Sequence, residues 1–104
     1  MKDEKAQGIR ASLGERTILV IDDSEAVRTA LEVLLSLEGA EVAVADSPRA
    51  GLDRVAEGDI DLVIQDMNFS TDTTSGVEGI QLFHAIRTLD PDLPVILLTA
   101  WTSL

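Results

Sequence analysis

The feature that most constrains this chain is a short apolar run followed by a helical pattern, repeated along the sequence. Thr17 to Ile21 is apolar at nearly every position and stops abruptly at Asp22-Asp23. Such a run is typical of a strand buried on both faces of a parallel sheet. The residues that follow place apolar side chains at helical spacing. Repetition of this unit predicts an α/β fold with a parallel sheet and right-handed crossovers.

Four strands and three helices are predicted in this way. The strands cover residues 17–21, 41–45, 60–65 and 95–98. Ser24 caps the first helix, which ends at Gly39, and Ser47-Pro48 begins the second, which ends at Gly58. The third helix ends at Asp90-Pro91. The apolar positions expected to face the core are Val27, Leu31, Leu34 and Leu35, then Leu52, Val55 and Ala56, then Ile80, Leu82, Phe83, Ile86 and Leu89.

Charge and length narrow the possible partners and the number of domains. The 19 acidic and 8 basic residues give a formal net charge of -11, which opposes binding to DNA or to an anionic membrane surface. No stretch reaches the roughly 18 apolar residues of a membrane span, and no secretory signal is present, so a cytoplasmic protein is expected. There is no cysteine to form a disulfide or a thiolate site. We expect a disordered leader over residues 1–16 and a single domain over residues 17–104.

Polar side chains stand where three of the predicted strands end. Asp22 and Asp23 follow the first strand, Asp66 the third and Thr99 the fourth. The carboxyl ends of parallel strands meet at one edge of the sheet, where α/β proteins collect their functional groups. Crowded carboxylates repel one another, and Mg²⁺ is a hard cation that relieves this repulsion. A carboxylate beside Mg²⁺ can also act as the nucleophile that accepts a phosphoryl group.

The residues around these strand ends resemble the three motifs of response regulator receiver (CheY-like) domains. The motifs are Ile18 to Ser24, Leu62 to Met67 and Pro94 to Ala100, in the family's order. The resemblance implies a flavodoxin-like doubly wound fold and phosphorylation of Asp66 by a sensor histidine kinase. The loop after Asp66, leading to Gly76-Val77-Glu78-Gly79, is similar to that of NtrC-type regulators of sigma-54-dependent transcription.

The resemblance also implies individual roles at the site. It implies that Asp22, Asp23, Asp66 and the main-chain carbonyl of Asn68 hold Mg²⁺. Thr99 would reorient its hydroxyl towards the phosphoryl group. The chain is not expected to be an enzyme in its own right.

The chain departs from the family pattern in two places. Asp72 lies in an unusually long polar segment over residues 68–75, which is predicted to be a surface loop or a lid. Receivers normally continue beyond the threonine to a fifth strand carrying a lysine and a last helix, but no lysine follows Lys5 and Arg87 is predicted on the solvent side. An incomplete sheet of order 2-1-3-4 is therefore expected. Its exposed fourth strand predicts a homodimer or larger oligomer, joined through that edge or by exchange of the C-terminal segment.

Other interpretations of these residues stay open at this point. The Asp22-Asp23 pair could be only a helix-capping turn, and Trp101 either contacts the site or frays. Glu25 is expected to have a structural role in the first helix, and His84 is expected to be a surface residue. A non-switching interaction module is the alternative function. A phosphatase using Asp66 is disfavoured because Asn68 stands where a second acid is usual, and a dinucleotide site is disfavoured because Asp22-Asp23-Ser24 replaces the required glycines.

Overall fold

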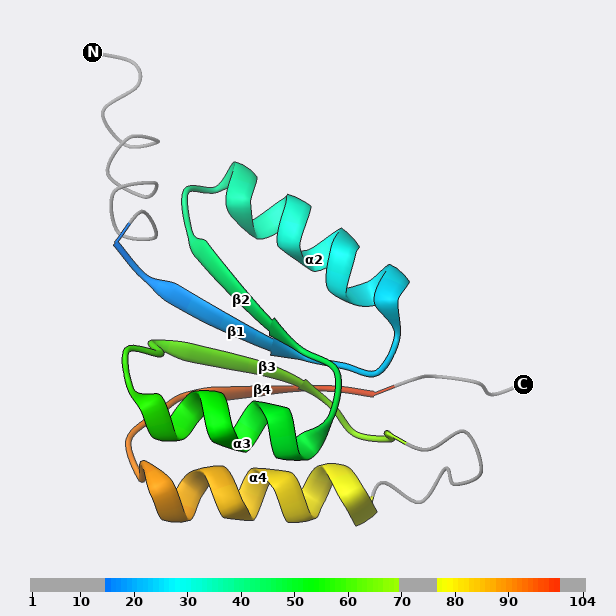
Figure 1. Cartoon of the computed structure of the whole chain (residues 1–104), viewed down its shortest axis with the longest axis vertical. Coiled ribbons are helices and arrows are strands. Elements are labelled where there is room, and N and C mark those ends of the chain that lie inside the picture. The colour runs from blue at the N-terminus through cyan, green and yellow to red at the C-terminus, as the bar shows by residue number, and fades with distance from the viewer. Residues whose placement is uncertain (1–14, 70–76, 100–104) are drawn as a thin grey trace.

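The computed structural model of the chain describes residues 15–69 and 77–99. Its elements are β1 (Thr17–Ile21), α2 (Glu25–Leu37), β2 (Glu41–Ala45), α3 (Pro48–Glu57), β3 (Leu62–Asp66), α4 (Val77–Leu89) and β4 (Val95–Leu98). The strands form one parallel sheet in the order β2-β1-β3-β4 (Figure 1). The predicted α/β fold and strand order are confirmed. None of the helices in the described ranges is long and apolar enough to cross a membrane.

The helices lie on both faces of the sheet because alternate residues of the central strands point in opposite directions. Leu19, Ile21 and Val63 join the larger core cluster with side chains of α3 and α4. Ile18 and Ile64 belong to the smaller cluster, on which α2 packs. Figure 1 shows α2 on one side of the sheet, with α3 and α4 together on the other. This arrangement explains why β1 and β3 read as continuous apolar runs.

Helix ends follow the predicted capping chemistry. The hydroxyl oxygen of Ser24 accepts a hydrogen bond from the Val27 N–H at 3.3 Å, and that of Ser47 accepts from Ala50 at 3.1 Å. These bonds satisfy amides that a first helical turn leaves without partners. Beyond α2, Gly39 has a φ of 95°, a conformation that favours glycine. The chain therefore turns sharply back to the sheet there.

The third strand begins later than predicted. It covers Leu62–Asp66 rather than residues 60–65. Asp59 has a φ of 72°, and the Asp61 carboxylate accepts a hydrogen bond from the Thr17 N–H at 2.8 Å. The chain is thus still turning at Ile60, and the apolar character of that residue reflects packing against the core rather than strand pairing.

Several apolar side chains expected in the core are exposed. Leu34 is 58% exposed, Leu89 50% and Ile80 46%, and Ala56 is exposed as well. No residue of α2 is fully buried. Helical spacing predicts which residues share a face, but the width of the buried stripe depends on what packs over it. Among the described residues, nothing covers the outer apolar positions of α2.

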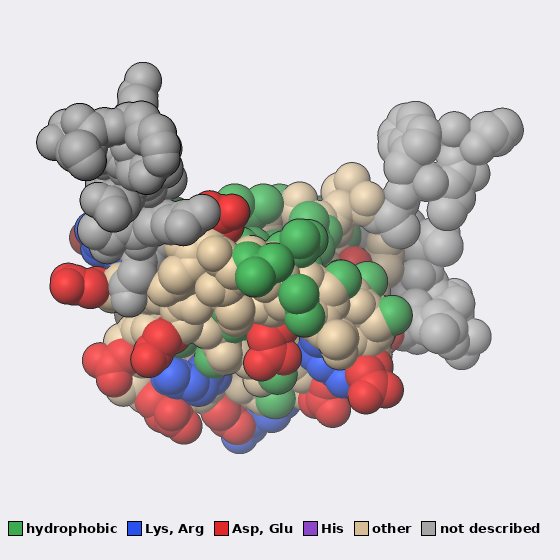
Figure 2. Space-filling model, turned by 90° about the horizontal axis from the view of Figure 1, so that it is seen from above, with side chains coloured by type: hydrophobic (Ala, Val, Ile, Leu, Met, Phe, Trp, Pro, Cys, Tyr) green, Lys and Arg blue, Asp and Glu red, His purple; other side chains and the backbone are tan. Residues whose placement is uncertain are grey.

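The fourth strand is exposed as the sequence suggested. In the described part of the chain, β4 pairs only with β3, and its Ile96 and Leu97 are 48% and 41% exposed. Figure 2 shows the molecule from above relative to Figure 1, so that the end at which α2 lies faces the reader. It shows hydrophobic side chains gathered in the centre of the view and acidic side chains around its lower rim. An apolar surface thus remains at this end of the molecule, and Ile96 and Leu97 expose further apolar side chains on β4.

Arg87 does not simply face solvent, as the helical pattern predicted. Its guanidinium donates hydrogen bonds to the main-chain oxygens of Pro91 at 3.0 Å and Leu93 at 2.6 Å, and it lies 5.1 Å from the ring centre of Phe83. These carbonyls belong to the turn beyond α4, which ends at Leu89, and a cation near a helix C-terminus also interacts favourably with the helix dipole. Arg87 therefore fixes the turn from α4 to β4 and is half-buried.

Candidate functional site

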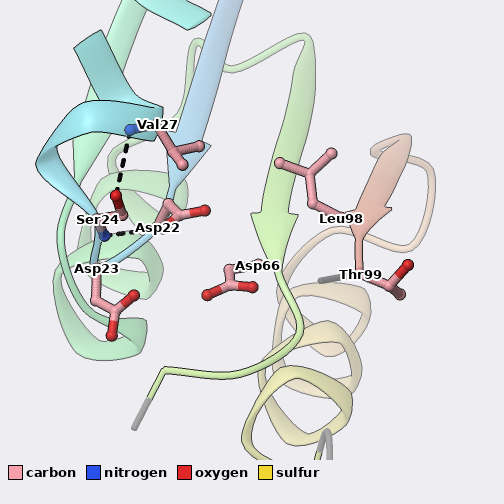
Figure 3. A pocket seen from close by; sticks show the side chains of 7 residues that line it. All are labelled: Asp22, Asp23, Ser24, Val27, Asp66, Leu98 and Thr99. Atoms are coloured by element: carbon pink, nitrogen blue, oxygen red, sulfur yellow. Dashed lines mark hydrogen bonds between the residues drawn. The ribbon is translucent and has the colours of Figure 1, made fainter. Parts of the chain in front are cut away.

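Three carboxylates meet at the carboxyl end of the sheet. Asp22 and Asp23 follow β1, and Asp66 ends β3, the neighbouring strand. One carboxylate oxygen from each can be chosen so that all lie within 4.8 Å of one another. They line an open pocket of about 420 Å³, together with Ser24, Val27, Leu98 and Thr99 (Figure 3). The predicted convergence of the strand ends is therefore present in the fold.

The main chain around Asp22 is held by hydrogen bonds from both directions. Its Oδ1 accepts from the Ser24 N–H at 2.8 Å, and its own N–H donates to the Ala45 oxygen at 3.0 Å. The Arg28 guanidinium donates to the Asp22 main-chain oxygen at 2.9 Å. Asp22 is only 5% exposed, whereas Asp23 is exposed. The Asp22 carboxylate thus holds Ser24, the N-cap of α2, in place, and this bond also orients the buried carboxylate beside Asp66.

Asp66 is positioned by the residues that follow it. Its Oδ1 accepts a hydrogen bond from the Asn68 N–H at 3.2 Å. The Met67 N–H donates to the Leu98 oxygen at 3.1 Å, so the chain after Asp66 is tied to β4. The side chain of Asp66 is half-buried and points into the pocket, towards Asp22 and Asp23 in Figure 3. One face of this carboxylate stays open to an incoming group.

Crowding changes the acidity of two of these groups. Burial raises the pKa of Asp22 above its ordinary value, and the Asp23 charge adds to this, against the Ser24 N–H and Arg28. Burial likewise raises the pKa of Asp66, with further increases from Asp22 and Asp23, against the amides of Asn68 and Met67. The apo site therefore carries unfavourable charge.

The donor set fits a hard divalent cation. Carboxylate oxygens are the ligands that Mg²⁺ prefers, and Mg²⁺ commonly keeps several waters beside one or two carboxylates. An open pocket leaves room for such waters and for a phosphoryl group. The unfavourable repulsion among the carboxylates would fall on binding, because a divalent cation offsets two negative charges.

The remaining predicted site residues are placed less directly. Thr99 lines the same pocket but is exposed, and its side chain points away from Asp66 in Figure 3. Asn68 lies beside Asp66 through its N–H, while the role of its carbonyl stays a prediction. Asp72 and Trp101 lie outside the described residues. His84 is exposed and packs edge-on against Phe83 at 5.6 Å, away from the pocket-lining set.

Comparison with known proteins decides the family. Residues 18–104 match the family described as response regulator receiver domain. The chain belongs to this family. The receiver has relatives among larger regulators, including FleR of Pseudomonas aeruginosa (40% identical over 84 residues), AfsQ1 of Streptomyces coelicolor (39% over 84) and ZraR of Escherichia coli K12 (37% over 86). FleR is a response regulator protein, and AfsQ1 and ZraR are transcriptional regulatory proteins.

These relatives are much longer than this receiver. The matched segments cover 81% of the chain but 17% of FleR and 35% of AfsQ1, and 83% of the chain but 18% of ZraR. Among solved structures, a receiver domain of Clostridium thermocellum is 34% identical with a TM-score of 0.72, over 81% of this chain and 64% of that one. TrrA of Thermotoga maritima, solved with Mg²⁺ and BeF, is 32% identical with a TM-score of 0.73, over 84% and 71%.

Sequence reasoning missed two residues that support the receiver site. Gln65 is fully buried immediately before the Asp66 carboxylate, and Arg28 bonds to the Asp22 main chain. Gln65 did give a signal, because it is the single polar residue before Asp66 in an otherwise apolar strand. Arg28 gave none beyond its position one helical turn after Ser24.

Proposed function

We propose that this receiver is the phosphoacceptor module of a two-component response regulator, in which a sensor histidine kinase phosphorylates Asp66 in a Mg²⁺-dependent reaction. The observation that carries the proposal is the half-buried Asp66 carboxylate at the end of β3, within reach of Asp22 and Asp23. TrrA, a relative of known structure, binds Mg²⁺ and BeF. The proposed module covers residues 17–104 and acts in the cytoplasm, where it would be substrate rather than enzyme.

The proposed reaction transfers a phosphoryl group from a phosphohistidine. A carboxylate oxygen of Asp66 attacks phosphorus, the new P–O bond forms, and the P–N bond breaks with its electron pair leaving on the imidazole, which then takes up a proton. The open face of the Asp66 carboxylate admits the phosphorus. The Asn68 N–H, 3.2 Å from the Asp66 Oδ1, keeps that oxygen oriented.

The other residues of the pocket prepare the acceptor. Asp22 and Asp23, with Asp66 and the Asn68 carbonyl, would hold Mg²⁺. When bound, the cation would neutralise charge on the phosphoryl oxygens. The Arg28 hydrogen bond and the Ser24 N–H keep the Asp22 turn in place. Thr99 would rotate its hydroxyl from its present outward position to a phosphoryl oxygen.

A small phosphodonor tests this proposal without the cognate kinase. The protein is incubated with acetyl phosphate, with Mg²⁺ or with EDTA, and its mass is measured for the parent and for Asp66→Asn. A phosphoryl adduct on the parent that needs Mg²⁺ and is missing from the variant is the expected result. An adduct of equal yield on Asp66→Asn, or none on the parent, contradicts the assignment.

The exposed apolar surface favours a second proposal, in which the chain also associates with a copy of itself. The β4 edge has no partner strand among the described residues, and its Ile96 and Leu97 are exposed. An unpaired edge with apolar flanks is prone to pair with another strand. The net charge of -11 opposes association, so salt should strengthen it by screening. Exchange of the C-terminal segment between two copies of the chain is the other way in which this surface could be covered.

Light scattering, measured over a range of salt concentrations, distinguishes an associated form of the chain from a monomer. A dimer or larger oligomer whose population grows with salt, and which Ile96→Asp abolishes, is expected. Exposed Glu41→Lys on β2, at the opposite edge of the sheet, is the control and should leave association intact. A monomer at every salt concentration contradicts the association. If dimers form while Asp66 takes no phosphoryl group, the chain acts as a non-switching interaction module instead.

A further inference from the structure

Gln65 is a buried polar side chain that packing alone does not explain. It lies in β3 next to Asp66 and is 0% exposed, on the face covered by α3 and α4. Its Oε1 is buried with no hydrogen-bond partner in residues 15–69 and 77–99. An unpaired buried acceptor disfavours the fold, and a hydrophobic side chain would fill the same space without that penalty. A polar residue here therefore needs another reason.

The amide nitrogen of Gln65 supplies that reason, because it joins two segments. Nε2 donates to the Gly79 main-chain oxygen at 2.9 Å and to the Asp66 main-chain oxygen at 3.1 Å. Gly79 lies in the first turn of α4, fourteen positions along the chain. The Gln65 side chain thus links the first turn of α4 to the main chain of the acceptor.

Further contacts bring the same two segments together. The Gly79 N–H donates to the Met67 oxygen at 2.9 Å, and the Phe69 N–H donates to the Glu78 carboxylate at 3.3 Å. Gly79 packs so closely that an added Cβ would lie 2.4 Å from the Met67 Cα and oxygen. The start of α4 is therefore pressed directly against the residues that follow Asp66.

We propose that Gln65 is a positioning residue that couples Asp66 to the first turn of α4. The proposal rests on the phosphorylation of Asp66 proposed above. The segment held by Gln65 carries the Asn68 N–H that contacts the Asp66 carboxylate. Moving this segment would change the geometry of the Asp66 carboxylate. In turn, movement of Asp66 on phosphorylation would shift the first turn of α4 through the Gln65 hydrogen bonds. Gln65 acts through the main chain and touches no reacting atom.

The variant Gln65→Met tests the coupling with little change of volume. It removes two hydrogen bonds and one unpaired acceptor together, so overall stability should change little. Two quantities are measured: the rate of adduct formation with acetyl phosphate and Mg²⁺, and hydrogen exchange at the Gly79 N–H with and without the phosphodonor. Gln81→Met, an exposed glutamine on the same helix, is the matched control.

In the parent and in Gln81→Met, phosphorylation should change the exchange rate at Gly79. In Gln65→Met, exchange at Gly79 should be about fivefold faster before phosphorylation, adduct formation roughly tenfold slower, and the response of Gly79 to phosphorylation lost. A merely structural role for Gln65 does not predict this lost response.

Gly79→Ala attacks the same junction from the helix, because its Cβ meets Met67 while Gln65 is retained. This variant should also abolish the change in hydrogen exchange on phosphorylation. Exchange is measured at the Ile80 N–H in both the variant and the parent. If the parent is phosphorylated, but Gln65→Met shows the parent's hydrogen exchange at Gly79 and the same response to phosphorylation, the coupling is overturned and the proposed function stands. A parent that forms no adduct overturns the proposed function and the coupling with it.

Discussion

The substitution Asp66→Asn should make the metal-free protein more stable and the Mg²⁺-loaded protein less stable than the parent. It removes one charge from three carboxylates whose ligand oxygens lie within 4.8 Å of one another. At that separation each pair repels by about 0.9 kcal/mol at the dielectric constant of water. The water value is a lower limit, because Asp23 is exposed and Asp66 half-buried whereas Asp22 is only 5% exposed. The two repulsions lost therefore amount to about 2 kcal/mol.

Part of this gain is offset by weaker hydrogen bonds. The Asn68 N–H donates to a charged oxygen in the parent and to a neutral one in the variant, which costs about 1 kcal/mol. The net gain is then about 1 kcal/mol, equivalent to a melting temperature roughly 4–8 °C higher for a domain of this size. In about 1 M salt, where the screening length is about 3 Å, the gain should shrink.

Mg²⁺ should reverse the order. A ligand at about 100 times its dissociation constant stabilises a folded protein by about 2.7 kcal/mol, and the variant lacks one of the three carboxylates that would bind it. Thermal unfolding is followed in EDTA and in Mg²⁺, with exposed Asp46→Asn as a control of equal charge change. The reasoning is refuted if Asp66→Asn is destabilised in EDTA, or if Mg²⁺ stabilises parent and variant equally.

Three further predictions follow from the same contacts. Folding raises the pKa values of Asp22 and Asp66, so the contribution of these two carboxyl groups to stability is present below their unfolded pKa and is lost as pH rises through their folded pKa. The stability advantage of Asp22→Asn over the parent in EDTA should therefore grow from about pH 4 to pH 7. A difference in stability that does not depend on pH would contradict this prediction. Gly51→Ala should cost about 1–3 kcal/mol in urea unfolding, because its Cβ would lie 2.5 Å from Cδ1 of the buried Ile21; an unchanged midpoint would show that Ile21 moves aside freely. Thr99→Val should keep the parent's melting temperature, since Thr99 is exposed, yet lower the rate of adduct formation roughly tenfold; equal rates would remove Thr99 from the site.

The sequence predicted the architecture and the carboxylate cluster because both depend on local pattern. Ile18 to Ile21 is apolar at every position because β1 is central in the sheet and buried on both faces. Parallel strands end at the same edge, so Asp22 and Asp66 had to meet once the strands were assigned. No knowledge of side-chain packing was needed for that step.

The features that were missed depend on contacts between distant segments. Leu34 shares a helical face with the packed Leu31, yet its exposure depends on what covers α2. Arg87 was assigned to solvent by periodicity, but its partners are carbonyls of the turn beyond the helix. Gln65 was recognisable as polar within a buried strand, whereas its bond to Gly79 required the path of the chain to be known.

The central claim is that Asp66, and not its neighbours, accepts the phosphoryl group. Borohydride reduces an aspartyl phosphate to homoserine, which marks the modified residue permanently. The protein is treated with acetyl phosphate and Mg²⁺, reduced, digested and mapped by mass spectrometry. Homoserine at position 66 alone, and none after treatment in EDTA, is the predicted result. Homoserine at Asp22 or Asp23, or at position 66 regardless of Mg²⁺, would contradict it.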